Sequence, residues 1–348
     1  MKRILAIAIL LALIVPQSKG QDIHFSQYFH TPLIVNPAFT GVFGGDQRAM
    51  LIYRNQWSSV ATPYKTFGGS FDMRAIDKRN SSFSLGTGLG VYKDVAGDTD
   101  FGITNVVLSL SGIIQLSKKQ YFTVGAQGGF EQRSINNANL IWDSQYDGNG
   151  YNSSLSSQEN TNYGQGINNG DINVGIGWVY SESSKTIVSS DVFTLKLGGV
   201  YQHLTQQKID FGETPDKLYN KLSMHGESNI SVNSSNVSFQ PSFIYQKQGP
   251  SQEILVGSLI RYAFGHDSQY TGLMNQTALF FGVHARIGDA LIPSVGYEIA
   301  NWKITASYDA NMSGLSTVSN GVGGFEISLI FINPNPFNYG KGNSSRFN

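Results

Sequence analysis

The clearest evidence for the fold is one segment of eleven residues, Asp171-Ile172-Asn173-Val174-Gly175-Ile176-Gly177-Trp178-Val179-Tyr180-Ser181. Two sets of side chains alternate along it: Ile172, Val174, Ile176, Trp178 and Tyr180 in one set, and Asp171, Asn173, Gly175, Gly177 and Ser181 in the other. A period of two places successive side chains on opposite faces of a β-strand. The segment therefore predicts a strand with one apolar face, which suits contact with lipid, and one face of small or polar residues.

The same alternation recurs along most of the chain from Gln47 onward. In residues 83–91 large apolar residues alternate with Ser and Gly, and in residues 325–331 they alternate with Glu326 and Ser328. Counting such segments predicts about fourteen strands, each about long enough to cross a membrane in a barrel: 47–57, 65–75, 82–93, 101–116, 120–133, 171–181, 192–205, 218–232, 236–247, 252–264, 277–287, 291–300, 302–310 and 320–331. We expect a transmembrane up-and-down β-barrel over residues 47–331, with both chain ends on one side because the count is even.

A two-sheet sandwich is the alternative architecture, because its strands alternate as well. A sandwich turns its bulky residues inward and its polar residues toward water. Here apolar rows recur on nearly every strand, while the opposite rows are Gly, Ser, Asn and Gln. A barrel explains both faces, because lipid covers the apolar face and the polar face lines the lumen. This favours the barrel over the sandwich.

Composition agrees with the barrel and limits the partners. The chain has 39 glycines, 17 tyrosines, 21 phenylalanines, no cysteine and 14% charged residues, whereas a soluble domain usually carries about 25% charged residues. Removing residues 1–20 takes away three bases and no acid, which leaves 21 basic against 24 acidic residues. This balance argues against nucleic acid as a partner, because phosphate binding depends on clustered Lys and Arg.

The N-terminus reads as a secretory signal peptide over residues 1–20. Lys2 and Arg3 precede the apolar run Ile4 to Val15, and Ser18 and Gly20 permit cleavage before Gln21. No later stretch approaches the roughly 20 apolar residues of a membrane-spanning helix. We therefore expect any membrane insertion to use strands.

Residues 21–46 lack strand alternation and are predicted to form an N-terminal arm that is periplasmic or plugs the barrel. Neither of its prolines suits the middle of a sheet, and Asn36-Pro37 reads as an N-cap followed by proline in a short helical turn that Gly41 can close. The expected arm or plug residues are Phe25, Gln27, Tyr28, Pro32, Asn36 and Pro37. Glycines from Gly86 to Gly90 lie inside a strand and open no helix, so we expect them to permit a bend or a close approach of the arm.

Because successive side chains of a strand lie on opposite faces, Arg54 is expected to face the lumen if Tyr53 faces outward. Asp72 also faces inward if Phe71 and Met73 face lipid, and it lies on the neighbouring strand. We therefore predict that Arg54, Gln56 and Asp72 form a polar cluster that holds the arm through Gln27 or Asn36.

The long connection Ser134 to Gly170 is an external loop in this scheme. Its aromatic residues stand among Asn, Ser and Gly, a composition that suits recognition by rigid rings and adaptable polar groups. We predict a partner-binding loop that uses Trp142, Tyr146, Tyr151 and Tyr163; a plain solvated loop is the alternative. Asp143, Asp147 and Asn149 are weak calcium candidates, because turns use Asp, Asn and Gly in any case.

Nothing in the sequence predicts catalysis or a cofactor. The six histidines are scattered, and neither a Gly-x-Ser-x-Gly elbow nor a zinc-binding His-x-x-x-His pair occurs. We expect His284, which alternates with apolar neighbours, to line the lumen. The chain is therefore expected to be no enzyme and to need neither cofactor nor metal.

The arm, together with Tyr53-Arg54-Asn55-Gln56-Trp57 and Pro63-Tyr64, resembles the start of the PorP/SprF family, and the resemblance returns in Ser307-Tyr308-Asp309 and in residues 324–329. It spans nearly the whole mature chain. Two departures stand out: Phe325 replaces a frequent His, and Arg346-Phe347 lacks a preceding Cys-Pro.

The resemblance implies an outer-membrane protein of the type IX secretion and gliding machinery. The even strand count then predicts both termini and the tail 332–348 in the periplasm. It implies either export or surface anchoring of a partner adhesin through that adhesin's C-terminal sorting domain, or a core role with periplasmic ring or peptidoglycan-binding components. A diffusion porin or a hydrophobic-solute transporter is the alternative function.

Overall fold

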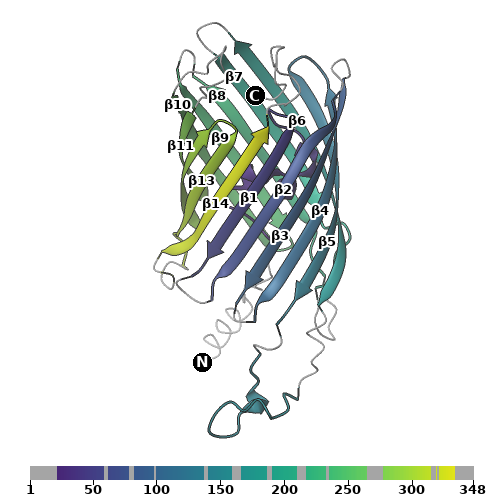
Figure 1. The fold of residues 1–348 in the computed structure, drawn as a ribbon, viewed down its shortest axis with the longest axis vertical. Coiled ribbons are helices and arrows are strands. Elements are labelled where there is room, and N and C mark those ends of the chain that lie inside the picture. The colour runs from purple at the N-terminus through teal and green to yellow at the C-terminus, as the bar shows by residue number, and fades with distance from the viewer. Residues whose placement is uncertain are drawn as a thin grey trace, which may run out of the picture.

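The fold is a closed antiparallel β-barrel (Figure 1). The computed structural model describes residues 22–58, 62–77, 82–97, 99–136, 140–158, 166–185, 190–209, 217–232, 235–264, 277–314, 319 and 321–333. Over these residues fourteen strands follow one another around the wall, and β1 closes the barrel by pairing with β14. The predicted fold is confirmed. The predicted signal peptide and residues 334–348 of the predicted tail lie outside the described residues.

Each predicted strand is present, with bounds shifted by a few residues at most ends. The strands are β1 (Gln47–Gln56), β2 (Tyr64–Asp77), β3 (Phe83–Ala96), β4 (Phe101–Gln115), β5 (Gln120–Ser134), β6 (Ile167–Lys185), β7 (Ser190–Gln202), β8 (Lys221–Ser231), β9 (Val237–Gln248), β10 (Ser251–Phe264), β11 (Thr277–Arg286), β12 (Ala290–Ile299), β13 (Trp302–Asn311) and β14 (Val322–Asn333).

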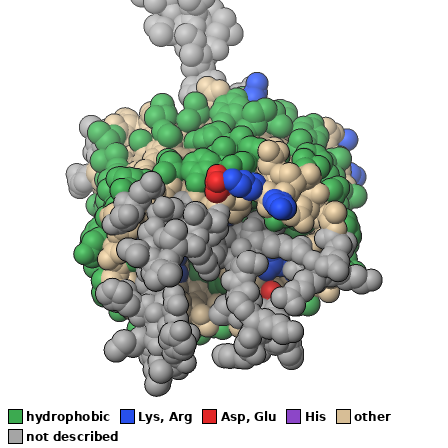
Figure 2. Space-filling model, turned by 90° about the horizontal axis from the view of Figure 1, so that it is seen from above, with side chains coloured by type: hydrophobic (Ala, Val, Ile, Leu, Met, Phe, Trp, Pro, Cys, Tyr) green, Lys and Arg blue, Asp and Glu red, His purple; other side chains and the backbone are tan. Residues whose placement is uncertain are grey.

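The apolar faces of the strands lie on the outer surface of the barrel. On β6 the side chains of Ile172, Val174 and Ile176 are exposed, whereas Asp171 and Asn173 are buried inside. Figure 2 shows hydrophobic side chains around the outer wall. Aromatic pairs lie on the same surface, including Trp57 with Tyr64 and Tyr53 with Phe67. Where the chain is described, no helix is long and apolar enough to cross a membrane.

The barrel has two different ends. We call the end that carries the β1–β2, β5–β6 and β9–β10 connections the loop end, which is lowermost in Figure 1, and the opposite end, where β1 begins and β14 ends, the turn end. The connection between β5 and β6 extends well beyond the barrel at the loop end, as Figure 1 shows.

The arm lies inside the barrel and contains three short helical turns. They are η1 (Tyr28–His30), α2 (Pro32–Val35) and η2 (Pro37–Phe39). The predicted cap is present: the Asn36 side chain accepts a hydrogen bond from the Ala38 N–H (2.9 Å), and Pro37 follows as the first residue of η2. Gly41 has a φ of +74°, in the left-handed region that glycine adopts freely.

The expectation that both chain ends lie on one side is wrong for the described residues. Asp22 lies at the loop end, where its carboxylate is 3.5 Å from the ammonium of Lys221 at the start of β8. Asn333 lies at the turn end, opposite Gln47. The number of strands is even, as predicted, so β1 begins and β14 ends at the same end of the barrel. The arm, however, runs the length of the lumen before β1 begins, and this places Asp22 at the far end.

Candidate functional site

The arm lies in the middle of the barrel and is deeply buried. The side chains of Gln27, Leu33, Asn36, Ala38 and Thr40 are completely inaccessible to solvent. Such burial needs the polar groups of the arm to find partners on the wall. The contacts along the lumen show which residues provide them.

Two carboxylates of the wall hold the first part of the arm. Glu326 on β14 accepts hydrogen bonds from the backbone N–H of Ser26 (2.7 Å) and of Gln27 (2.9 Å), one through each oxygen. Asp309 on β13 accepts the Ser26 hydroxyl at 2.8 Å. Carboxylates bond strongly to backbone donors in a buried setting, so this pair fixes the path of the arm.

Two arginines neutralise these carboxylates. The Arg54 guanidinium lies 3.4 Å from Glu326 and 3.6 Å from Asp309, and it also donates to the His24 carbonyl. Arg286 on β11 lies 3.0 Å from Asp309. We call Arg54, Arg286, Asp309 and Glu326 the charge cluster. In this cluster each buried carboxylate contacts an arginine and also accepts a hydrogen bond from the arm.

The Gln27 and Asn36 side chains anchor the arm to opposite parts of the wall. The Gln27 amide donates to the Ser307 hydroxyl (2.9 Å), and its oxygen accepts from the Ser328 hydroxyl (2.6 Å). The Asn36 amide donates to the carbonyls of Ile176 (3.1 Å) and Gly199 (3.3 Å). Both side chains therefore bind the wall, but their partners in the described chain are not Arg54, Gln56 or Asp72, the residues predicted to hold them.

The predicted pairing of Arg54 with Asp72 is wrong. Asp72 binds Arg48 at 2.7 and 2.9 Å and accepts the Gly41 N–H at 2.8 Å, so it holds the other end of the arm. Across β1–β2, Arg48 stands opposite Asp72, whereas Arg54 stands opposite Thr66.

The partner of Arg54 comes from the closure of the barrel, because the pairing of β1 with β14 places Glu326 directly opposite Arg54. Gln56 ends β1, half-buried, and makes no hydrogen bond to the arm among the described residues. The predicted single cluster is thus two sites, one near each end of the arm.

The aromatic residues of the arm pack into separate apolar clusters. Phe25 packs against the buried Met50, Ile52 and Tyr92. Tyr28 packs with Ile244, Leu255 and Ile292 on the opposite wall. Phe29 stacks on His284, with 5.0 Å between ring centroids, and His284 bonds the Ser242 hydroxyl at 3.0 Å. His284 therefore lines the lumen, as predicted.

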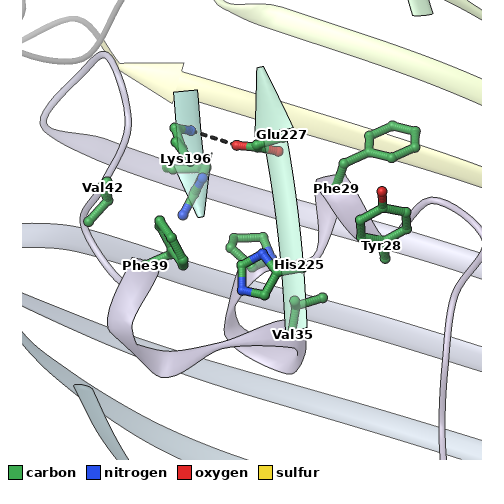
Figure 3. Close-up of a pocket in the computed structure, with 10 residues that line it drawn as sticks. Tyr28, Phe29, Val35, Phe39, Val42, Lys196, His225 and Glu227 are labelled. Atoms are coloured by element: carbon green, nitrogen blue, oxygen red, sulfur yellow. Dashed lines mark hydrogen bonds and ion pairs between the residues drawn. The ribbon is translucent and has the colours of Figure 1, made fainter. Parts of the chain in front are cut away.

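A cavity of about 450 Å³, which includes space open to solvent, remains between the arm and β7–β8 (Figure 3). Pro32 and aromatic residues of the arm line one side, and the ion pair Lys196–Glu227 (2.7 Å) with His225 lies on the other. The Arg48 guanidinium also borders the cavity. Its charged groups are paired, since Arg48 binds Asp72 and Lys196 binds Glu227.

A second ionic cluster holds the start of the arm at the loop end. The His203 ring lies between two carboxylates, with Nδ1 3.0 Å from Asp171 and Nε2 3.1 Å from Asp22. Burial lowers the pKa of His203, but Asp22 and Asp171 outweigh burial and raise the pKa to about 9. Burial also acts to raise the pKa of Asp22, yet Lys221 and His203 hold that pKa well below its usual range.

The backbone of His203 adopts a φ of +60°, which is uncommon for any residue other than glycine. Asn173 accepts its N–H at 2.9 Å, and Asn220 donates to its carbonyl at 2.6 Å. We call Asp22, Asp171, His203 and Lys221 the arm latch. The sequence shows no motif for it, because its members come from four separate segments.

The predicted partner-binding residues lie on the connection between β5 and β6. Tyr146 and Tyr151 are exposed and form an isolated bridge with each other, and Trp142 is half-buried just before the helical turn η4 (Asp143–Gln145). Tyr163 lies outside the described residues.

Asp147, one of the three weak calcium candidates, has another role in the described part of the loop. Asp147 accepts the N–H groups of Asn149 (2.9 Å) and Gly150 (3.0 Å), as a turn residue does. In the described ranges, no group of three His, Cys, Asp or Glu side chains is placed to hold a metal ion.

The sequence alone does not assign the partners of the arm on β13 and β14, Asp309 and Glu326. Asp309 and Glu326 stood within Ser307-Tyr308-Asp309 and residues 324–329, the segments that carried the family resemblance, but their roles needed the closed barrel. Alternation alone signals that both face inward, because each has apolar neighbours on the opposite face.

Comparisons with known proteins identify one family. The model of the type IX secretion system membrane protein family PorP/SprF matches residues 17–331. No curated protein matches the chain.

Among solved structures, the chain is similar to the toluene transporter TbuX of Ralstonia pickettii, with 13% identity over 86% of this chain and 91% of that chain and a TM-score of 0.42. It is also similar to a deltaS2 mutant of the monoaromatic hydrocarbon channel TodX, with 10% identity over 86% and 93% of the two chains and a TM-score of 0.44. BamA from Haemophilus ducreyi, lacking POTRA domains 1–3, matches with 10% identity over 83% and 70% of the two chains and a TM-score of 0.41.

Proposed function

The chain belongs to the PorP/SprF family of type IX secretion system membrane proteins, and on that premise we propose that it is a non-enzymatic barrel that serves export or surface anchoring of a partner adhesin. The partner engages the barrel through the C-terminal sorting domain of the adhesin. The family and the fold together make the chain an outer-membrane protein associated with secretion.

The single observation that carries a non-transport role is the buried arm. A barrel of about fourteen strands is wide enough to need a filling if it is not to conduct. Here Gln27, Leu33 and Asn36 occupy the lumen with no accessible surface, and Asp72, Glu326 and Ile176 hold the arm from different sides. A molecule built this way is suited to holding another protein rather than to passing solutes.

We orient the barrel with the loop end toward the cell exterior. Outer-membrane barrels carry longer loops outside and short turns in the periplasm. The connections at the turn end include Leu116 to Lys119 and Ala300-Asn301, and the longest there has 12 residues, between Phe264 and Thr277, whereas 32 residues separate Ser134 from Ile167 at the loop end. In this orientation Asp22 lies on the exterior side, and components of the periplasmic ring have access to the turn end.

Gene deletion tests the proposal and separates its two forms. In a strain that lacks this gene, secreted and surface proteins are compared with the wild type by mass spectrometry of culture medium and of surface-labelled cells. We expect one adhesin to disappear from the surface while other type IX substrates persist. Loss of every substrate assigns the core role. Unchanged secretion and display of all substrates contradicts the proposal.

A further inference from the structure

The β5–β6 connection carries an ordered element that the barrel itself does not need. Residues 140–158 extend beyond the loop end (Figure 1). Loops of this length without regular structure are uncommon in compact domains and are usually functional or disordered. This one is ordered by its own hydrogen bonds.

Gln145 joins the limbs of this element. Its N–H donates to the Trp142 carbonyl at 3.0 Å, and its own carbonyl accepts the Asn152 N–H at 2.8 Å. Its side-chain amide donates to the Leu155 carbonyl at 3.0 Å, and Gln145 is buried despite its place in a loop. Asp147 closes the tip by accepting two backbone N–H groups.

The hydrogen bonds of Gln145 and Asp147 support a loop whose large apolar side chains are exposed to solvent. The exposed fractions are 71% for Ile141, 60% for Tyr146, 52% for Tyr151 and 39% for Leu155. Tyrosines on a rigid support are frequent anchors at protein interfaces, because they bury much surface for little lost conformational freedom. A fixed loop that exposes these four residues is organised for binding.

The charge of the connection indicates what it binds. Residues 135–166 contain Asp143, Asp147 and Glu159 and no Lys, Arg or His. A negative element is repelled by anionic lipid headgroups and by nucleic acid. Opposite charge across an interface speeds association and excludes wrong partners. A protein surface with basic residues around an apolar groove complements both features.

We propose that Ile141, Tyr146, Tyr151 and Leu155, which we call the loop tip, dock into an apolar groove with a basic rim on the secreted partner. The inference rests on the proposed function, because it assigns the partner to the exterior face of the same barrel. It goes further by naming the residues that make contact and the chemistry of the surface that receives them.

The experiment uses the full-length barrel in detergent and the purified C-terminal domain of the adhesin that disappears in the deletion strain. Affinity is measured by biolayer interferometry for the wild type and for the double variant Tyr146→Ser/Tyr151→Ser. We expect the double variant to bind about tenfold more weakly or worse, since interface tyrosines are frequent hot spots. The wild-type affinity should fall as salt rises, and Asp143→Asn should reduce this dependence.

Ile287→Ser is the matched control. Ile287 is 60% exposed, lies in the β11–β12 turn at the same end of the barrel, and is outside the loop tip. It should bind like the wild type. Retained heat-modifiable migration of each variant on gels shows that the barrel is folded.

The outcomes separate the inference from the proposed function. If no adhesin depends on the gene, or the wild type fails to bind the domain, the proposed function fails. If the wild type binds and Tyr146→Ser/Tyr151→Ser binds equally well, the inference fails and the proposed function stands. If the double variant instead converts a dimer of the wild type to a monomer, the loop tip binds a second copy, and the inference is overturned.

Discussion

His203 joins the start of the arm to the wall, because its ring lies between the carboxylates of Asp22 and Asp171. Its pKa is about 9 in the folded protein, against 6.5 for an ordinary histidine. Because the folded state raises this pKa, the latch stabilises the fold fully below pH 6.5 and loses that contribution as pH rises through about 9. We therefore expect the melting temperature to fall between pH 7.5 and 10.

His203→Gln isolates this effect, because glutamine keeps hydrogen-bonding groups and cannot gain a proton. The wild type should lose more thermal stability than the variant over the same pH range, as followed by scanning fluorimetry of the purified protein in detergent. Other groups titrate alike in both proteins. Equal losses in the two proteins would show that the ion pairs with Asp22 and Asp171 contribute nothing measurable.

Arg54 shows how far residue-level reasoning from the sequence can go. Alternation with Tyr53 places it in the lumen, and it is buried there. Its partner could not be chosen by looking at adjacent strands alone, since both Asp72 and Glu326 face the same space. The register across the β1–β14 seam decides for Glu326, and that seam joins the two ends of the sequence.

The arm as an element depends on glycines in the wall beside it. A Cβ built on Gly125 lies 2.3 Å from the Ala38 nitrogen and 2.4 Å from the Pro37 carbonyl carbon. These atoms are backbone and cannot move away without shifting η2. We expect Gly125→Ala to lower the free energy of unfolding by about 1–3 kcal/mol, the usual cost of overpacking.

Gly128→Ala is the control on the same strand, because a Cβ there meets no atom within 4 Å. Urea unfolding of both variants, followed by tryptophan fluorescence, gives the free energies. Protease sensitivity of the arm, read by mass spectrometry, shows whether Gly125→Ala loosens it. If the two variants are equally stable, close packing of η2 against β5 does not contribute to stability.

The elements themselves could be predicted from the sequence more completely than their mutual placement. Period-two alternation located the strands, and Asn36-Pro37 located a capped turn in the arm. Gly86 and Gly88 were expected to permit bending or a close approach, and each lies against Thr40 of the arm. The direction of the arm was not predictable, because composition does not say whether a segment before β1 stays at the turn end or runs through the lumen.

In the molecule as a whole, the arm occupies the middle of a wide barrel whose two ends differ. The charge cluster and the arm latch hold its first residues near the loop end, and Asp72 holds Gly41 near the turn end. Attachment near both ends resists withdrawal in either direction. We therefore expect the arm to stay in the lumen while a partner binds at one end of the barrel.

Planar-bilayer conductance tests whether the arm blocks the lumen or whether the barrel acts as a diffusion porin. The purified full-length chain should give no large steady current, because buried arm residues such as Leu33 and Asn36 fill the lumen. Removing residues 22–41 keeps every strand, and the shortened barrel, if folded, should conduct in discrete steps because barrels wider than about eight strands are not filled by wall side chains alone. A large steady current from the full-length protein would favour the porin, since it would mean that the arm leaves the lumen under working conditions.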